Sequence, residues 1–109
     1  MKLALAQLNT RVGAIEENTG KVLEAIGRAR DELCSDLVLF PELTLSGYPP
    51  EDLLLHSGLR KRIEAAFERV QSETHGIAVL LGLPEYEDGA IYNSAVLLEN
   101  GEVLAKHRN

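Results

Sequence analysis

The sequence has little cysteine, no tryptophan and few aromatic residues. Cys34 is the one cysteine among 109 residues, and 5% of the residues are aromatic. A single cysteine excludes an internal disulfide framework and is ordinary for a reducing compartment. The 45% of residues that are hydrophobic must therefore hold the chain together. We expect a cytoplasmic protein.

A long apolar run and an excess of positive charge are also missing. No stretch is apolar over the roughly 20 residues that a membrane-spanning helix needs, and no secretory signal is present. Eleven basic against 17 acidic residues give a net charge of -6. Binding to nucleic acid requires clustered Lys and Arg, and the one basic cluster, residues 60–62, fits the polar side of a helix. We expect neither a membrane nor a nucleic-acid partner.

Metal-ligating residues are sparse as well. His56, His75 and His107 stand far apart in the sequence, with no second ligand at a spacing typical of a metal centre. No motif for binding ATP occurs either. We therefore predict that these residues bind no metal and no cofactor.

The apolar pattern that is present predicts alternating strands and helices. Val22, Ile26 and Ala29 recur at helical spacing, and Asn100-Gly101 is typical of a tight hairpin. The order of elements predicts an α/β sheet in one unit, with right-handed crossovers. We expect strands over residues 2–8, 36–40, 77–83, 91–98 and from 103 onward, a polar turn at 85–89, and helices over 16–33, 52–55 and 59–74.

Residues 36–50 carry the clearest functional signal, because they join a short apolar strand to a carboxylate and a turn. Leu37 to Leu39 predict a buried strand, and Pro41 ends it by removing a hydrogen-bond donor. Glu42 is then expected at the carboxyl end of a strand, the edge where open α/β sheets bind ligands. By position alone, Glu42 could equally cap a helix or pair with an arginine.

The longer motif FPELTLSGYPPEDLLL, residues 40–55, resembles the glutaminase domain at the N-terminus of glutamine-dependent NAD synthetases. These enzymes belong to the nitrilase, or carbon-nitrogen hydrolase, superfamily. Phe-Pro-Glu is found across the superfamily, whereas the Ser-Gly-Tyr-Pro-Pro-Glu-Asp-Leu-Leu part is particular to the synthetases. The resemblance runs nearly end to end, with further matches at residues 5–9, 12–15, 18, 82–84, 92–95, 101 and 103.

The resemblance implies the first half of a nitrilase-like α-β-β-α sandwich. Residues 1–109 would form the N-terminal part of the glutaminase domain, and the rest of that domain and the synthetase domain would lie outside this chain. One face of the sheet would then lack its covering layer, and Leu80, Val96 and Leu98 are expected to await it. We expect the isolated chain to associate, with the remainder of its own polypeptide, with other subunits or as a homo-oligomer.

The resemblance also implies hydrolysis of the side-chain amide of glutamine, through a thioester on a cysteine beyond residue 109. This chemistry needs a thiolate, a base that returns the thiol proton to the leaving ammonia, and a cation near the oxyanion. Glu42 matches the family's general base. Tyr48 is a candidate to line the path of glutamine or ammonia, or to pack the loop. The parent enzyme would use the ammonia to amidate nicotinic acid adenine dinucleotide, with ATP and Mg²⁺ bound by the synthetase domain.

Two residues, Cys34 and Asn109, invite comparison with the family's catalytic cysteine and lysine. Cys34 is not expected to be the nucleophile, because it precedes a strand that separates it from Glu42 by roughly 20 Å at ~3.3 Å per residue. The family's lysine falls on Asn109, which carries no charge. Either the alignment slips and Lys106 points elsewhere, or the residue is altered. Strand alternation favours the second, because Lys106 and Arg108 would share one face and residue 109 the other.

Three functions stay open at this point. The chain can be the glutaminase part of a synthetase, inactive alone; a non-catalytic interaction module; or a simple amidase of the nitrilase superfamily. The Pro-Pro-Glu-Asp-Leu-Leu extension favours the synthetase over the amidase. An apolar, uncovered sheet face favours a fragment over a natural module.

Overall fold

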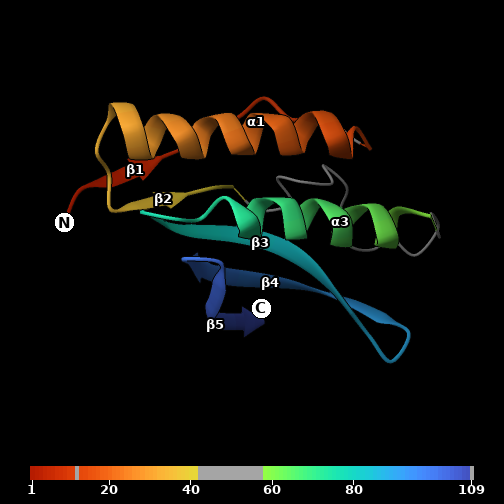
Figure 1. Ribbon diagram of the computed structural model, residues 1–109. Helices are drawn as coiled ribbons and strands as arrows, with labels where there is room; N and C mark the ends of the chain where they lie inside the picture. Colours follow the sequence, from red (N-terminus) through yellow and green to blue (C-terminus); the bar gives the residue numbers. More distant parts are fainter. Residues whose placement is uncertain (12, 42–57, 109) are drawn as a thin grey trace.

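The computed structural model describes residues 1–11, 13–41 and 58–108. They form a five-stranded sheet with helices on one side (Figure 1). The strands, in their order across the sheet, are β1 (Leu3–Leu5), β2 (Leu37–Leu39), β3 (Ala78–Glu87), β4 (Ala90–Glu99) and β5 (Glu102–Arg108). The helices are α1 (Ile15–Gly27), its wider π-helical continuation η1 (Arg28–Glu32), and α3 (Leu59–Ser72).

The sheet is parallel on one side and antiparallel on the other. β1 pairs with β2 and β2 with β3 in parallel, and β3, β4 and β5 follow as two antiparallel hairpins. Parallel neighbours need a crossover, and the helices supply it. Figure 1 shows α1 and α3 on the same side of the sheet. The α/β expectation is confirmed.

The two long helices bury one stripe each, as their spacing predicts. Val22 and Ile26 of α1 and Ile63 and Val70 of α3 are all buried, and they pack on the sheet. The residues of each pair are four or seven positions apart, a spacing that keeps side chains on one helix face. No helix among the described residues is long and apolar enough to cross a membrane.

The core includes two residues that were expected on the uncovered face. Val96 and Leu98 are 1% and 0% exposed and belong to the core under the helices, so the expectation that they await a partner is wrong. The register gives the reason: Val96 pairs with Leu81 and Leu98 with Val79, and side chains paired across a ladder share a face. We call this side, with Val38, the covered face.

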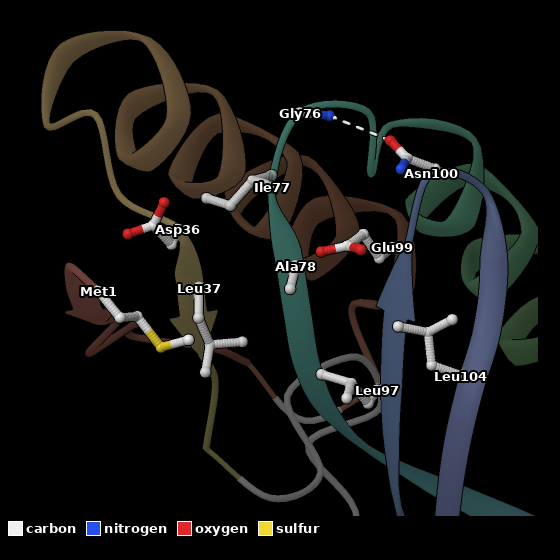
Figure 2. A pocket seen from close by; sticks show the side chains of 10 residues that line it. All are labelled: Met1, Asp36, Leu37, Gly76, Ile77, Ala78, Leu97, Glu99, Asn100 and Leu104. Carbon is white, nitrogen blue, oxygen red and sulfur yellow. Dashed lines mark hydrogen bonds between the residues drawn. The ribbon is translucent and has the colours of Figure 1, made fainter.

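The opposite side of the sheet, which we call the open face, carries a shallow apolar hollow of about 490 Å³. Figure 2 shows Leu37, Ala78, Leu97 and Leu104 on the side of the strands that faces away from α1, with Met1 beside them. A register shift between Leu97 and Leu98 makes Leu104 an extra residue in β5, and Leu104 is half exposed. Within the described ranges no helix lies over this face (Figure 1).

Some boundaries differ from the prediction. β3 continues to Glu87, so the expected turn at 85–89 shrinks to Asp88-Gly89, both with positive φ. Such a pair suits a two-residue hairpin turn, and Asn100-Gly101 forms the second one as predicted. The helix expected at 52–55 lies outside the described residues.

Candidate functional site at the carboxyl edge of the sheet

Four strands point to the same edge of the sheet. β1, β2 and β3 are parallel, and two antiparallel steps turn β5 back into their direction. Pro41 follows β2 at this edge, where ligands bind in open α/β sheets. The predicted site residues Glu42 and Tyr48 follow in the sequence, and both lie outside the described residues, as does Asn109.

β5 ends further along the sheet than β2. β2 ends at Leu39, which pairs with Leu80. The last residue of β5, Arg108, pairs with Ser94, and Ser94 pairs with Leu83, three positions past Leu80. The end of β5 therefore lies beyond the end of β2, in the direction in which β2 runs.

Side chains fix the loop between β1 and α1 at this edge. The fully buried Asn18 accepts a hydrogen bond from the backbone nitrogen of Arg11 at 2.9 Å and donates one to the carbonyl oxygen of Arg11 at 2.8 Å. Arg62 of α3 donates to both carboxylate oxygens of Glu16, at 2.6 and 3.1 Å. The hydrogen bond from Arg62 lowers the pKa of Glu16. The starts of the two helices are thereby joined.

Glu85 collects donors from two neighbouring strands at the same edge. Its carboxylate accepts a hydrogen bond from the hydroxyl of Ser94 on β4 at 2.5 Å, and from Arg108 Nη2 on β5 at 2.9 Å. The ammonium of Lys106 lies 3.5 Å from the same carboxylate. The bonds from Arg108 and then from Ser94 lower the pKa of Glu85 to about 2. We call Glu85, Glu87, Ser94, Lys106 and Arg108 the Glu85 cluster.

Arg108 is held on more than one side. Its guanidinium also donates to Glu87 and lies 4.2 Å from the centre of the Tyr92 ring. The hydrogen bonds to Glu85 and Glu87 raise the pKa of Arg108. Lys106 and Arg108 share a face, as the alternation predicts. Both cations pair with Glu85, and Arg108 pairs with Glu87 as well, so carboxylates lie beside both positive charges.

A second hollow, of about 480 Å³, lies between α3 and the end of β3. Arg60 lies over the ring of Tyr86, with its guanidinium carbon 5.1 Å from the ring centre. The hydroxyl of Tyr86 is buried and has no hydrogen-bond partner among the described residues, and burial raises its pKa. The hollow is also lined by Ile63, Glu64, Phe67, Glu68, Gln71, Leu83, Pro84, Glu85 and Lys106.

Cys34 does not belong to this edge. It is exposed, with φ of 53°, between η1 and the start of β2. The start of β2 is the end of the strand away from Pro41, the last described residue before Glu42. In the described ranges no three His, Cys, Asp or Glu residues gather as a metal site would require.

The sequence interpretation missed Glu85. Its polar neighbours favoured a turn at 85–89, although the pattern Leu83, Glu85, Glu87 has the period of a strand. The opposite charges at Lys106 and Arg108 repeat with the same period. Negative charges at every second position of one predicted strand and positive charges at every second position of another indicate that the two strands lie close together. This pattern would have linked Glu85 and Glu87 to Lys106 and Arg108.

Comparison with known proteins agrees with the resemblance. Residues 2–109 match the carbon-nitrogen hydrolase family. The chain is 44% identical, over 99% of its length, to the glutamine-dependent NAD(+) synthetase of Xanthomonas campestris, and 42% identical to that of Aquifex aeolicus. It spans about one fifth of the length of these curated relatives, since it covers 20% and 19% of them.

Solved structures share the fold. The glutamine-dependent NAD+ synthetase of Acinetobacter baumannii superposes with a TM-score of 0.87 at 37% identity, over 99% of this chain and 20% of that one. An amidase from Nesterenkonia sp. superposes with a TM-score of 0.88 at 30% identity, over 100% of this chain and 42% of that one. The mixed sheet with its helices therefore has the nitrilase-superfamily arrangement.

Proposed function

Because the chain belongs to the carbon-nitrogen hydrolase family, we propose that it forms the first part of a glutaminase domain that releases ammonia from glutamine. The observation that carries this proposal is the 44% identity to a glutamine-dependent NAD(+) synthetase across 99% of the chain. The motif at residues 40–55 supports the same branch of the family.

We extend the proposal to the whole protein. It would be a ligase that uses the ammonia, with ATP and Mg²⁺, to amidate nicotinic acid adenine dinucleotide to NAD. ATP and Mg²⁺ are assigned to a synthetase domain beyond this chain, because the chain covers 20% of the Xanthomonas synthetase. We also propose a cytoplasmic location, since a single cysteine suits a reducing compartment. We propose a homo-oligomer because the open face is apolar and no helix lies over it within the described ranges.

In the proposed reaction Glu42 acts as the general base. It takes the proton of a cysteine thiol located beyond residue 109, and the sulfur attacks the amide carbon of glutamine. The carbon-nitrogen bond then breaks, and Glu42 returns the proton to the leaving ammonia. Water hydrolyses the thioester to glutamate. Tyr48 is proposed to line the path of glutamine or ammonia. The support for Glu42 is its place in the motif, directly after the proline that ends β2.

The oxyanion of the proposed reaction needs a hydrogen-bond donor or a cation beside it. The position expected for lysine is Asn109, and an amide donates hydrogen bonds without a positive charge. Lys106 and Arg108 are paired with Glu85. We therefore propose that residue 109, and neither of these two cations, faces the reacting amide, and that Asn109→Lys raises the rate of glutamine hydrolysis.

The test uses the natural full-length polypeptide. Glutamate is measured after incubation with glutamine, and NAD formation is measured with either glutamine or free ammonia as the nitrogen source. Glu42→Gln should lower glutamine hydrolysis roughly 10²–10⁴-fold, the range for loss of a general base, and leave ammonia-dependent NAD formation intact. Glu24→Gln, on the exposed side of α1, is the control and should change neither activity. Full glutamine hydrolysis in Glu42→Gln would contradict the assignment.

A simple amidase is the second candidate. The similarity to the Nesterenkonia amidase supports it, since that protein is 30% identical over 100% of this chain, against 44% for the Xanthomonas synthetase. An amidase would hydrolyse short aliphatic amides and form no NAD. A full-length polypeptide that hydrolyses no amide at all would instead favour the non-catalytic interaction module.

A further inference from the structure

β5 is held at its end by side chains more than by burial. All seven residues of β5 are exposed, so apolar contacts contribute little to its position. Beyond its ladder with β4, the last part of the strand is tied to β3 by Arg108 and Lys106, which both reach Glu85. The ladder with β4 and these side-chain contacts therefore account for the position of the end of β5.

The contact between Glu85 and Arg108 has the geometry that fixes a guanidinium. Arg108 Nη2 donates to one carboxylate oxygen at 2.9 Å and Nε lies 3.4 Å from the other, which is a two-point contact. The ring of Tyr92 stacks against the guanidinium plane. The hydroxyl of Ser94 occupies the second oxygen of Glu85. A glutamine at position 85 has nearly the same volume but one acceptor oxygen and no charge.

The place of this contact gives it a functional meaning. Arg108 is the residue directly before position 109, and the carboxyl end of β5 lies at the edge toward which β2 leads. Catalysis depends on the position of reacting groups, and a misplacement of 1 Å can lower a rate about 10²-fold. A shift of Arg108 would displace the end of β5 at this edge.

We propose that Glu85 is a positioning residue for the hydrolase site, which acts by fixing Arg108 and thereby the point at which the chain leaves β5. This inference rests on the proposed glutaminase function. In this role Glu85 does not contact the substrate. Its effect passes through Arg108, so the two residues act as one unit.

The experiment compares variants of the natural full-length polypeptide in steady-state glutamine hydrolysis. Glu85→Gln should lower kcat roughly 100-fold and leave KM for glutamine within about twofold, because substrate binding is untouched. Arg108→Gln should have the same effect, and the double variant should be no slower than either single variant. Glu32→Gln removes a comparable ion pair with Arg28, 3.0 Å long and exposed, and should change nothing.

Hydrogen exchange supplies a readout that does not depend on activity. In Glu85→Gln the amides of residues 105–108 should exchange faster, whereas those of β3 and the helices should not. Unchanged exchange in β5, or additive losses of kcat in the double variant, overturns the positioning role. A loss of kcat that is equal to the loss of folded protein also overturns the positioning role. Absence of glutamine hydrolysis in the wild type overturns the proposed function instead; faster exchange confined to β5 would then support the same role for another reaction at this edge.

Discussion

The two faces of the sheet are built from similar residues and meet different environments. The covered face presents Val79, Leu81, Val96 and Leu98, all 0–1% exposed beneath the helices. The open face presents Leu37, Leu97 and Leu104 around a shallow hollow (Figure 2). Hydrophobicity alone does not distinguish them. The difference shows that the core of this chain lies on the covered face, whereas the open face is apolar and has no helix over it within the described ranges.

The sharpest test of this comparison removes the same side chain from each face. Leu81→Ala should lower the free energy of unfolding by about 2–5 kcal/mol, since the helices cannot close over the cavity completely. Urea unfolding of the 1–109 chain measures it. The matched variant Leu97→Ala, on the open face beside Leu104, should cost clearly less. Equal losses would mean that the open face is covered in solution.

A second prediction concerns the end of α3, where the covered face is closed by hydrogen bonds. The buried Thr74 accepts a bond from the backbone nitrogen of Gly101 at 2.9 Å and donates one to the carbonyl oxygen of Gln71, also at 2.9 Å. Thr74→Val keeps the volume but leaves a backbone donor without its partner, at a cost of about 1–3 kcal/mol. Thermal unfolding should show it, with Ser72→Ala on the exposed end of α3 as the control.

A third prediction addresses the open face directly. If this face drives association, the isolated chain should form oligomers that light scattering detects, and Leu104→Lys should shift the population toward monomer. Lysine disfavours an apolar contact between sheets, and the exposed position accommodates it without loss of folding. Leu33→Lys, at the end of η1, outside the sheet and also exposed, controls for added charge. A clean monomer of the unaltered chain at high concentration would contradict the prediction.

The smallest expected effect is a dependence on pH at the Glu85 cluster. The pKa of Glu85 is lowered from 4.5 to about 2 by Arg108 and Ser94. A carboxylate with a lowered pKa contributes stability that is fully present above its unfolded pKa and is lost as the pH falls through the folded value. The difference in stability between wild type and Glu85→Gln should therefore shrink from pH 5 toward about pH 2. A constant difference would mean that Glu85 is not ionised in the folded chain.

Local patterns predicted the elements well where each pattern is contained in one segment. Ile63, Ala66 and Val70 repeat at helical spacing, and α3 follows them. Asn100-Gly101 favours positive φ at two successive residues and forms the hairpin. The family also follows from a contiguous motif, residues 40–55, so inferring it requires no contact between distant segments.

Properties that depend on pairing between segments were missed. Nothing near Val96 or Leu98 in the sequence states which face they occupy, because a shift of one residue in the register exchanges the faces. Glu85 was assigned to a turn, although Ser94 and Arg108 stabilise it in a strand. These contacts join positions 9 and 23 residues apart.

The sequence by itself determined the family, the α/β class, the two long helices with their buried stripes and the tight hairpin at Asn100-Gly101, because periodicity and turn chemistry act over a few neighbouring residues. Only the tertiary structure decided that Val96 and Leu98 lie under the helices, that Leu104 is an extra residue beside the open face, and that Glu85 binds Arg108. Each of these depends on the register between strands, which is set when β3, β4 and β5 pair along their whole length.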